Sequence, residues 1–190
     1  MHTSLVVNKA KQIEEEYNRK ILLRGIVDLC LKKQDGVFHL TSGEARQVYF
    51  DLKQITLNPT YISIIVEELK RIILKSGIPW QEIQSVGGLE TGSIPIISHL
   101  TNAIGARGFY VRKEPKRHAL RNTIEGTCIA PYILVDDVVT TGFSMNQCES
   151  YLVDNGFGYA RAKLVILDRR STVYEDRNDV KTIFTEEEIK

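Results

Sequence analysis

Two stretches in the first part of the chain carry apolar residues at helical spacing. The first predicts a helical segment over residues 8–33, with apolar positions at Ile13, Tyr17, Ile21, Leu22, Ile26, Val27, Cys30 and Leu31. The second begins at Asn58-Pro59, where Asn suits the N-cap and Pro the first helical position. Its apolar positions are Ile62, Ile65, Val66, Leu69, Ile72 and Ile73, and the helix should end at Gly77 and Pro79. Between the two helices, short β-like pieces at 37–40 and 47–52 flank a polar turn.

From residue 83 onward, strand patterns alternate with helix patterns. Strands are predicted over residues 83–86, 107–111, 133–135, 162–167 and, at an edge, 181–184; helices are predicted over 94–104 and 144–155. Residues 112–126 form a long polar segment. The alternation predicts an α/β fold with a central parallel sheet flanked by helices. Ligands of such sheets bind at the carboxyl ends of the strands, so the turns that follow the strands should converge on one site.

Composition and charge narrow the classes of function. A length of 190 residues suits a single compact domain, and 25 basic against 24 acidic residues give a net charge of +1. This balance argues against a general nucleic-acid or membrane surface. The sequence has neither a signal-peptide pattern nor a long apolar run. Cys30, Cys128 and Cys148 lack CxxC spacing, which predicts reduced cysteines of a cytoplasmic protein and neither a metal site nor a nucleophile.

The segment from Tyr132 to Ser144, YILVDDVVTTGFS, is the most informative part of the chain. An apolar strand ends in the paired carboxylates Asp136 and Asp137, and a polar turn then leads into a helix. The carboxylates suit sugar hydroxyls or a hydrated Mg²⁺, and the backbone N–H groups of the turn suit a phosphate. The alternative is an ordinary turn whose polar residues cap the helix. Adjacent buried acids are costly, however, unless a ligand or hydrogen bonds use them.

This segment resembles the phosphoribosyl-pyrophosphate (PRPP) signature of type I phosphoribosyltransferases. The resemblance implies that PRPP is bound by Asp136, Asp137, Val138, Val139, Thr140, Thr141, Gly142, Phe143 and Ser144. The turn GGLETGS at 87–93 is similar to the pyrophosphate loop of the family, here Glu90, Thr91 and Gly92, although this chain lacks the lysine that some members carry there. In that family a non-proline cis peptide bond is common in this loop. The resemblance therefore implies a cis peptide bond near Glu90–Thr91. A tight turn without a ligand is the alternative.

The basic stretch RKEPKRH at 112–118 narrows the resemblance. A solvated charge run is the usual interpretation, but a basic lid directly after a strand can neutralise a leaving pyrophosphate and exclude water. The spacing resembles the catalytic loop of orotate phosphoribosyltransferases, and Arg112, Lys113, Lys116 and His118 match it residue by residue. Ala119 stands where that family usually has glycine.

Two further segments resemble the base site of the same family. Residues 38–51 look like its N-terminal hood, which would turn Tyr49 and Phe50 toward the base; taken alone they are an ordinary hairpin. Thr41 replaces a lysine that some relatives use for binding. Arg169 matches the arginine that binds orotate, since a guanidinium suits a planar base with a carboxylate; an exposed strand-end arginine is the alternative. Thr140 is a further expected base contact.

The resemblance implies a type I phosphoribosyltransferase fold, with N-terminal helices and hood at 1–58 and a PRPP-binding α/β core at 59–190. The implied reaction is Mg²⁺-dependent transfer of phosphoribose from PRPP to orotate, giving orotidine 5′-phosphate and pyrophosphate in pyrimidine biosynthesis. Lys116, Asp136 and Asp137 would be catalytic, and Mg²⁺ would be held through PRPP and water without a direct protein ligand. A homodimer is implied, with each lid reaching the neighbouring active site.

Three alternatives stay open on the sequence. They are a phosphoribosyltransferase for another base such as a purine, a PRPP-sensing regulator, and an inactive scaffold. The absence of a separate nucleic-acid-binding element disfavours the regulator, and the lid lysines disfavour the scaffold. The first 20 residues have no assigned function.

Overall fold

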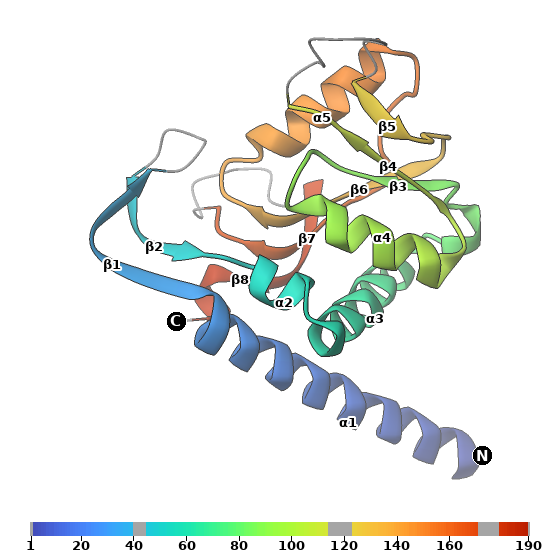
Figure 1. The fold of residues 1–190 in the computed structure, drawn as a ribbon. Coiled ribbons are helices and arrows are strands. Elements are labelled where there is room, and N and C mark those ends of the chain that lie inside the picture. Colours follow the sequence, from blue (N-terminus) through green and yellow to red (C-terminus); the bar gives the residue numbers. More distant parts are fainter. Residues whose placement is uncertain (1, 40–44, 114–122, 171–178, 190) are drawn as a thin grey trace.

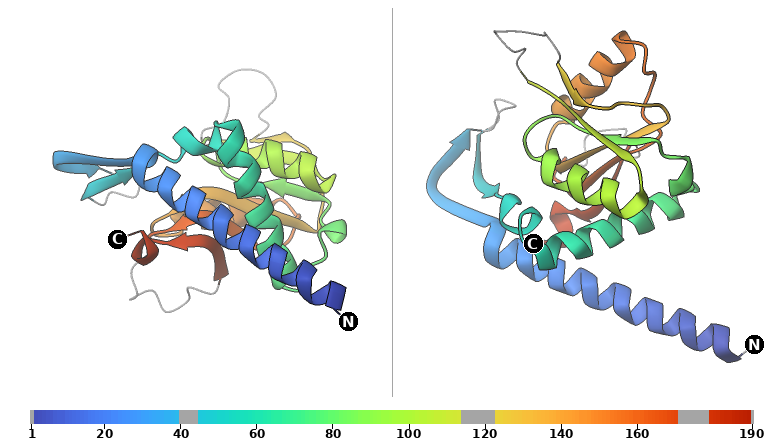
Figure 2. Two further views of the ribbon diagram at one scale, coloured as in Figure 1. Left: turned by 90° about the horizontal axis from the view of Figure 1, so that it is seen from below. Right: turned by 45° about the vertical axis from the view of Figure 1, so that its right-hand side comes forward.

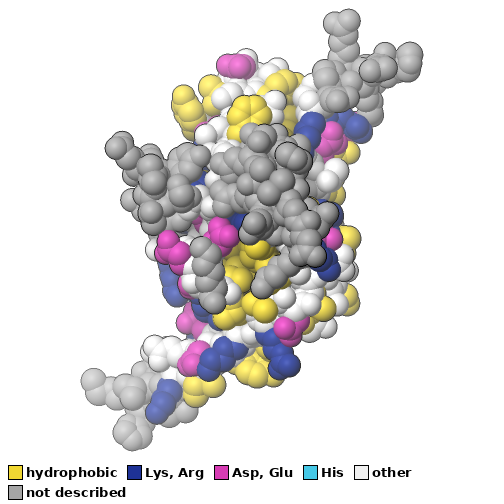
Figure 3. Space-filling model, turned by 90° about the vertical axis from the view of Figure 1, so that its left-hand side faces the viewer, with side chains coloured by type: hydrophobic (Ala, Val, Ile, Leu, Met, Phe, Trp, Pro, Cys, Tyr) yellow, Lys and Arg dark blue, Asp and Glu magenta, His cyan; other side chains and the backbone are white. Residues whose placement is uncertain are grey.

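The computed structural model describes residues 2–39, 45–113, 123–170 and 179–189, with side chains described from residue 7 onward except for 33–47. The predictions made for Thr41, Lys116, His118 and Ala119 lie outside these residues. Within the described residues, no helix is long and apolar enough to cross a membrane. Acidic and basic side chains are interspersed over the described part of the face in Figure 3, in keeping with the small net charge.

A six-stranded sheet forms the centre of the described part of the chain (Figure 1). Its order is β5 (Ile124–Gly126), β4 (Arg107–Val111), β3 (Ser85–Gly87), β6 (Tyr132–Val139), β7 (Lys163–Asp168) and β8 (Val180–Thr185). All neighbours pair in parallel except β5, which runs antiparallel to β4. The predicted α/β fold is confirmed, but the sheet is mixed rather than wholly parallel. The polar segment predicted over 112–126 ends in this edge strand, whose three residues are too short for a periodic signal.

Helices cover both faces of the sheet. α3 (Pro59–Lys75) and α4 (Ser93–Ile104) lie on one face, and α5 (Phe143–Asp154) lies on the other (Figure 1). Along β6, Ile133 and Val135 join the core beneath α3 and α4, whereas Tyr132 and Leu134 join the core beneath α5. Successive strand residues point to opposite faces, so a strand buried on both sides is a continuous apolar run.

The helix predicted from Asn58-Pro59 is confirmed as α3. The Asn58 side chain accepts a hydrogen bond of 3.0 Å from the backbone N–H of Thr60, and Pro59 is the first helical residue. The predicted apolar face is buried except for Ile72, which is only partly buried. Gly77, with φ of 71°, follows the helix end.

The N-terminal region differs most from its prediction. α1 (His2–Gly25) continues as the π-helical turn η1 (Ile26–Cys30), and strand β1 (Leu31–His39) then begins at a residue assigned to the helix. Leu31 leaves the helix because it pairs with Phe50 of β2 (Ala45–Phe50) in an antiparallel hairpin. The short helix α2 (Lys53–Thr56), which was not predicted, follows this hairpin.

Of the apolar positions predicted for the first helix, only some in its second half are buried. Leu22 and Ile26 are buried, whereas Ile13 and Tyr17 are 62% and 64% exposed. Figure 2 shows α1 running beneath α3, with its N-terminal end projecting past the rest of the molecule. Arg71 of α3 forms ion pairs with Glu15 of α1 and with Glu68. Helical spacing therefore predicted the helix correctly but not which part of it contacts the core.

Candidate active site

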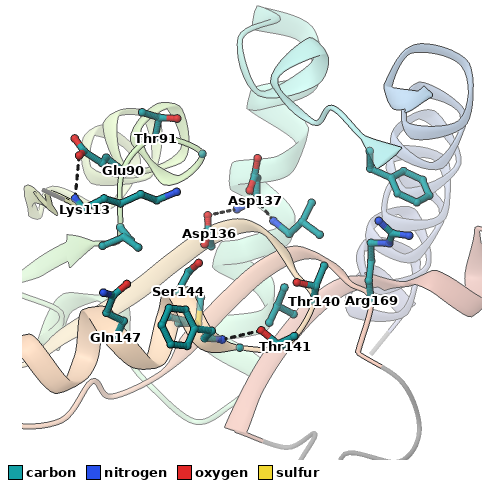
Figure 4. Close-up of a pocket in the computed structure, with 18 of the residues that line it drawn as sticks. Glu90, Thr91, Lys113, Asp136, Asp137, Thr140, Thr141, Ser144, Gln147 and Arg169 are labelled. Carbon is teal, nitrogen blue, oxygen red and sulfur yellow. Dashed lines mark hydrogen bonds between the residues drawn. The ribbon is translucent and has the colours of Figure 1, made fainter. Parts of the chain in front are cut away.

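A cavity of about 340 Å³ lies at the carboxyl ends of the strands, with the hairpin β1–β2 beside it (Figure 4). Its walls come from five segments that are distant in sequence: the end of the hairpin with α2, the turn after β3, the residue Lys113 after β4, the end of β6 with the start of α5, and the residue after β7. The lining residues are Tyr49, Phe50, Lys53, Leu89, Glu90, Thr91, Gly92, Lys113, Asp136, Asp137, Val138, Val139, Thr140, Thr141, Gly142, Phe143, Ser144, Met145, Gln147 and Arg169. The expected convergence at this edge of the sheet is confirmed.

The turn at 87–93 passes against the end of β6. The Glu90–Thr91 peptide bond is cis, as predicted. A Cβ atom added at Gly92 would lie 2.5 Å from Oδ1 of Asp137, so only glycine allows this approach. The backbone φ of Gly92 is −62°, which any residue can adopt. This glycine is therefore required by proximity to the carboxylate, not by its backbone conformation.

Asp136 and Asp137 lie inside β6, which extends to Val139 rather than ending at Val135. The Asp136 carboxylate accepts a hydrogen bond of 2.9 Å from the N–H of Asp137, whose own carboxylate accepts one of 2.8 Å from the N–H of Val138. Burial, with the charge of Asp137 added to it, raises the pKa of Asp136 well above 3.8. Burial also raises the pKa of Asp137, although hydrogen bonds and Lys53 oppose this shift. Two enclosed acids suit a ligand that offers hydroxyl donors or a cation.

The turn after β6 leads into the N-terminus of α5. Gly142 has a φ of 82° and precedes the first helical residue, and the N–H of Phe143 donates to the Thr141 hydroxyl at 3.2 Å. The side chains of Thr141 and Ser144 line the same cavity. Hydroxyls and backbone N–H groups at a helix N-terminus form a site for an anion the size of phosphate.

Two lysines bring positive charge to the cavity. Lys113 follows β4, and Figure 4 shows its side chain pointing toward Asp136. Lys53 of α2 lies 3.2 Å from the carboxylate of Asp51. Burial opposes the charge of Lys53, but the hydrogen bond and charge of Asp51, together with Tyr49 and Asp137, outweigh it and raise the pKa of Lys53. Lys53 was not among the predicted site residues. The only sequence signal for it is its position two residues after Asp51, the acid that ends the hood segment.

Arg112 is a predicted PRPP-binding residue that does not line the cavity. Its Nε donates to Glu125 of β5 at 2.9 Å, and its guanidinium lies 5.9 Å from the centre of the Tyr110 ring. The unforeseen strand β5 explains this placement, because it pairs Glu125 with Tyr110, which lies two residues before Arg112 and so on the same face of the strand. A role of Arg112 in binding PRPP stays a prediction.

Arg169 closes the far end of the cavity. Its side chain is 3% exposed, so the alternative of an exposed strand-end arginine is wrong. Its guanidinium lies 4.7 Å from the centre of the Phe50 ring, and its Nη2 lies 3.0 Å from the carboxylate of Glu186. Among the described residues, its buried Nε has no hydrogen-bond partner. The adjacent Arg170 instead pairs with Asp168 and Asp179, away from the cavity.

Comparison with known proteins identifies the family. No family model matches the chain. An orotate phosphoribosyltransferase of Leptospira biflexa is 35% identical over 160 residues, which span 80% of this chain and 84% of that protein. An orotate phosphoribosyltransferase of Pyrococcus abyssi is 33% identical over 159 residues, covering 82% and 84% of the two chains. This chain belongs to the orotate phosphoribosyltransferase family.

Solved structures agree with this family assignment. The orotate phosphoribosyltransferase of Aeropyrum pernix matches with a TM-score of 0.69 at 27% identity, over 90% of this chain and 94% of that chain. The Mycobacterium tuberculosis orotate phosphoribosyltransferase in complex with PRPP matches with a TM-score of 0.68 at 21% identity, over 90% and 98%, which supports the fold alone. The type I phosphoribosyltransferase fold is thereby confirmed.

The structure gathers most of the predicted site residues of this family member around one cavity. Those in the lining are Tyr49, Phe50, Glu90, Thr91, Gly92, Lys113, Asp136, Asp137, Val138, Val139, Thr140, Thr141, Gly142, Phe143, Ser144 and Arg169. Arg112 lies apart from them, and Lys116 and His118 are outside the described residues. The contact of each with substrate stays a prediction.

Proposed function

We propose that the protein transfers the phosphoribosyl group of PRPP to orotate, forming orotidine 5′-phosphate and pyrophosphate in pyrimidine biosynthesis. One observation carries the proposal beyond family membership: a single cavity has an acidic pair and an anion-binding turn on one wall and the buried Arg169 on another. A sugar phosphate fits the first wall. A planar base bearing a carboxylate fits the second, because a guanidinium binds carboxylates with two parallel hydrogen bonds.

PRPP is proposed to lie along the first wall. Its 5′-phosphate would bind the turn at 140–144, and its ribose hydroxyls would donate to Asp136 and Asp137. Its pyrophosphate would lie at residues 90–92, beside Lys113. This order follows the cavity from the start of α5 to the turn after β3. Lid residues Arg112, Lys116 and His118 are proposed to complete the pyrophosphate site.

The base is proposed to bind between the hood and the end of β7. Arg169 would pair with the orotate carboxylate or carbonyls, and Thr140 and the backbone of Tyr49 and Phe50 would contact the rest of the ring. The buried position of Arg169 in the cavity lining supports this placement, since a guanidinium in a water-poor site is a strong partner for a carboxylate or carbonyl.

The chemistry that follows is nucleophilic substitution at the anomeric carbon. A ring nitrogen of orotate forms a bond to this carbon while the bond to pyrophosphate breaks with inversion. Pyrophosphate leaves with the electron pair, and the proton of the ring nitrogen is released to water. Asp136 and Asp137 orient the ribose and stabilise positive charge that develops on it, and Lys116 stabilises the leaving group. Such contacts, made in full only in the transition state, raise turnover rather than affinity.

The residues present fit a magnesium requirement. Among the described residues, no group of three or more His, Cys, Asp or Glu side chains is placed to hold a metal ion. Asp136 and Asp137 are suited to hydrogen-bond the water shell of Mg²⁺ bound to PRPP. Mg²⁺ would supply neutralisation of the pyrophosphate charge. Asp136, Asp137 and Lys113 are among the residues that line this part of the cavity.

A cytoplasmic homodimer in which each lid serves the neighbouring site is part of this proposal. Mixing two inactive variants, Lys116→Ala and Asp136→Asn, tests it. Exchange of subunits would place an intact lid over an intact acidic pair in some sites, so activity should return on mixing. If the lid acts within its own chain, the mixture stays inactive although sedimentation shows a dimer.

The choice of base is tested by competition. Orotate, uracil, adenine and hypoxanthine are offered together with PRPP and Mg²⁺, and the nucleotides formed are separated and quantified. The proposal expects orotidine 5′-phosphate to dominate, because uracil and the two purines lack the carboxylate that Arg169 would bind. Preferential formation of a purine nucleotide would overturn the base assignment and leave the PRPP site in place.

A further inference from the structure

Glu186 meets Arg169 because of the register between the last two strands. Asp168 at the end of β7 pairs with Thr185 at the end of β8, so the next residues, Arg169 and Glu186, emerge side by side. The Nη2 of Arg169 lies 3.0 Å from Oε1 of Glu186. The backbone N–H of Arg169 donates to the carbonyl of Val139 at 2.8 Å, which fixes where the side chain starts.

The guanidinium is held from two directions. The Phe50 ring lies against one face, with a distance of 4.7 Å from Cζ to the ring centre, and Glu186 engages one terminal nitrogen. A buried ion pair of this kind is a weak source of stability, since desolvation offsets most of the attraction. Its main physical effect is to fix the plane of the guanidinium and so the direction in which its other N–H groups point.

Glu186 is itself rigidly supported. It begins the turn η4 (Glu186–Glu188), in which Thr185 and Glu188 form a capping box. Glu188 also pairs with Arg19 of α1 at 2.7 Å, and Arg19 donates to the carbonyl of Ile183 at 2.8 Å while its guanidinium lies over the Phe184 ring. Helix α1, which had no assigned function, thus supports the turn that carries Glu186.

We propose that Glu186 is a positioning residue that orients Arg169 for the base, with α1 and the C-terminal turn as its support. The inference rests on the proposed function, because Arg169 is there assigned to orotate. It predicts a selective effect: disturbing Glu186 changes the use of orotate and leaves PRPP binding alone, since Glu186 pairs with Arg169 and does not itself line the cavity with the acidic pair and the phosphate turn.

If the role of Glu186 were purely electrostatic, its removal would change orotate affinity in the opposite direction. Glu186 neutralises part of the charge on Arg169, so if attraction of the anionic base were its only effect, removing the carboxylate would tighten orotate binding. If orientation dominates, Glu186→Ala weakens orotate binding. Glu186→Gln, which keeps the shape and an acceptor oxygen, then causes a smaller loss.

The experiment measures KM for orotate and for PRPP separately in the wild type, Glu186→Ala, Glu186→Gln and the control Glu187→Ala, an exposed acid in the same turn. We expect the KM for orotate to rise about tenfold in Glu186→Ala, the loss of about 1.4 kcal/mol of binding, with PRPP unchanged. Glu186→Gln should lie between Glu186→Ala and the wild type, and Glu187→Ala should match the wild type.

Several outcomes would overturn the inference. An orotate KM that falls or stays within twofold in both Glu186 variants would do so. Equal changes in the KM for both substrates would also overturn it, because they indicate a general loss of structure. Thermal unfolding of each variant identifies this case. The milder Glu186→Gln keeps the test usable if Glu186→Ala does not fold. A wild type that does not use orotate removes the proposed function, and this inference falls with it.

Discussion

The side chain of Glu90 accepts a hydrogen bond of 2.9 Å from the backbone N–H of Lys113 (Figure 4). This bond joins the turn after β3 to the first residues of the predicted lid. Backbone bonds between Val111 and both Gly88 and Glu90 extend the same connection. The lid therefore starts from a fixed point beside the acidic pair, so Glu90 should affect the pyrophosphate end of the site more than the base end.

Replacing Glu90 tests this connection. Glu90→Ala removes the acceptor of the Lys113 N–H, and we expect the KM for PRPP to rise about tenfold while the KM for orotate changes little. Glu90→Gln keeps an acceptor and should be milder, and Glu82→Ala, at an exposed acid on a distant turn, serves as the control. Steady-state kinetics with each substrate varied provides the measurement. A larger effect on orotate than on PRPP would contradict the assignment.

Substitutions at two glycines distinguish the effect of steric crowding from the effect of an unfavourable backbone conformation. Gly92→Ala is allowed by its φ but places a Cβ against Asp137, so activity should fall by about 100-fold or more with little change in thermal stability. Gly77→Ala meets no atom within 4 Å but has a φ of 71°, so it should reduce stability by about 1 kcal/mol and leave both KM values unchanged. Thermal unfolding and turnover are measured for both variants. Equal activities would show that the turn does not need its close approach to Asp137.

The acidic pair should make the protein less stable as the pH rises. The pKa of Asp136 lies above 3.8 in the folded chain, so folding favours its protonated form. The unfavourable contribution of Asp136 to folding stability is absent below pH 3.8. It grows as the pH rises from 3.8 through the raised pKa of the folded state. Asp136→Asn should therefore unfold at a higher temperature than the wild type at pH 7, with the difference shrinking toward pH 4, while losing nearly all activity. A variant less stable than the wild type at pH 7 would refute the stated cause of the shift.

The cysteines should be unreactive and dispensable. Burial raises the pKa of Cys128 to about 11 and the pKa values of Cys30 and Cys148 to about 12, so all three are thiols at neutral pH. Iodoacetamide at pH 7.5 should leave turnover of the folded protein unchanged over an hour, with mass spectrometry to count modified sites. Rapid inactivation that follows modification of one cysteine would show that a reactive thiol supports the site.

Local sequence patterns predicted most of the core. Helix α3 followed from Asn58-Pro59 and its apolar spacing, and the acidic pair and its turn followed from one contiguous segment. The cis peptide at Glu90–Thr91 and the base-site assignment of Arg169 came from family resemblance, and the structure places the latter in the cavity lining. Helix α3 and the acidic turn depend on residues close together in sequence, which is why they could be predicted without the fold.

The features that were missed depend on contacts between distant segments. Leu31 continues an apolar helical pattern but pairs with Phe50, so tertiary pairing overrides the local preference. The same applies to Arg112, whose partner Glu125 lies on a strand too short to predict, and to Glu186, which meets Arg169 through strand register. Lys53 reaches the cavity because of the unpredicted helix α2.

The most direct test of the central claim follows the absorbance of orotate in a mixture of the protein, PRPP and Mg²⁺, with each component omitted in turn. We expect absorbance to be lost only when all are present, with pyrophosphate released in equal amount. Arg169→Ala should abolish this loss while PRPP still binds in a calorimeter. Unchanged absorbance with the complete mixture, from protein that binds PRPP, would contradict the claim that orotate is the acceptor.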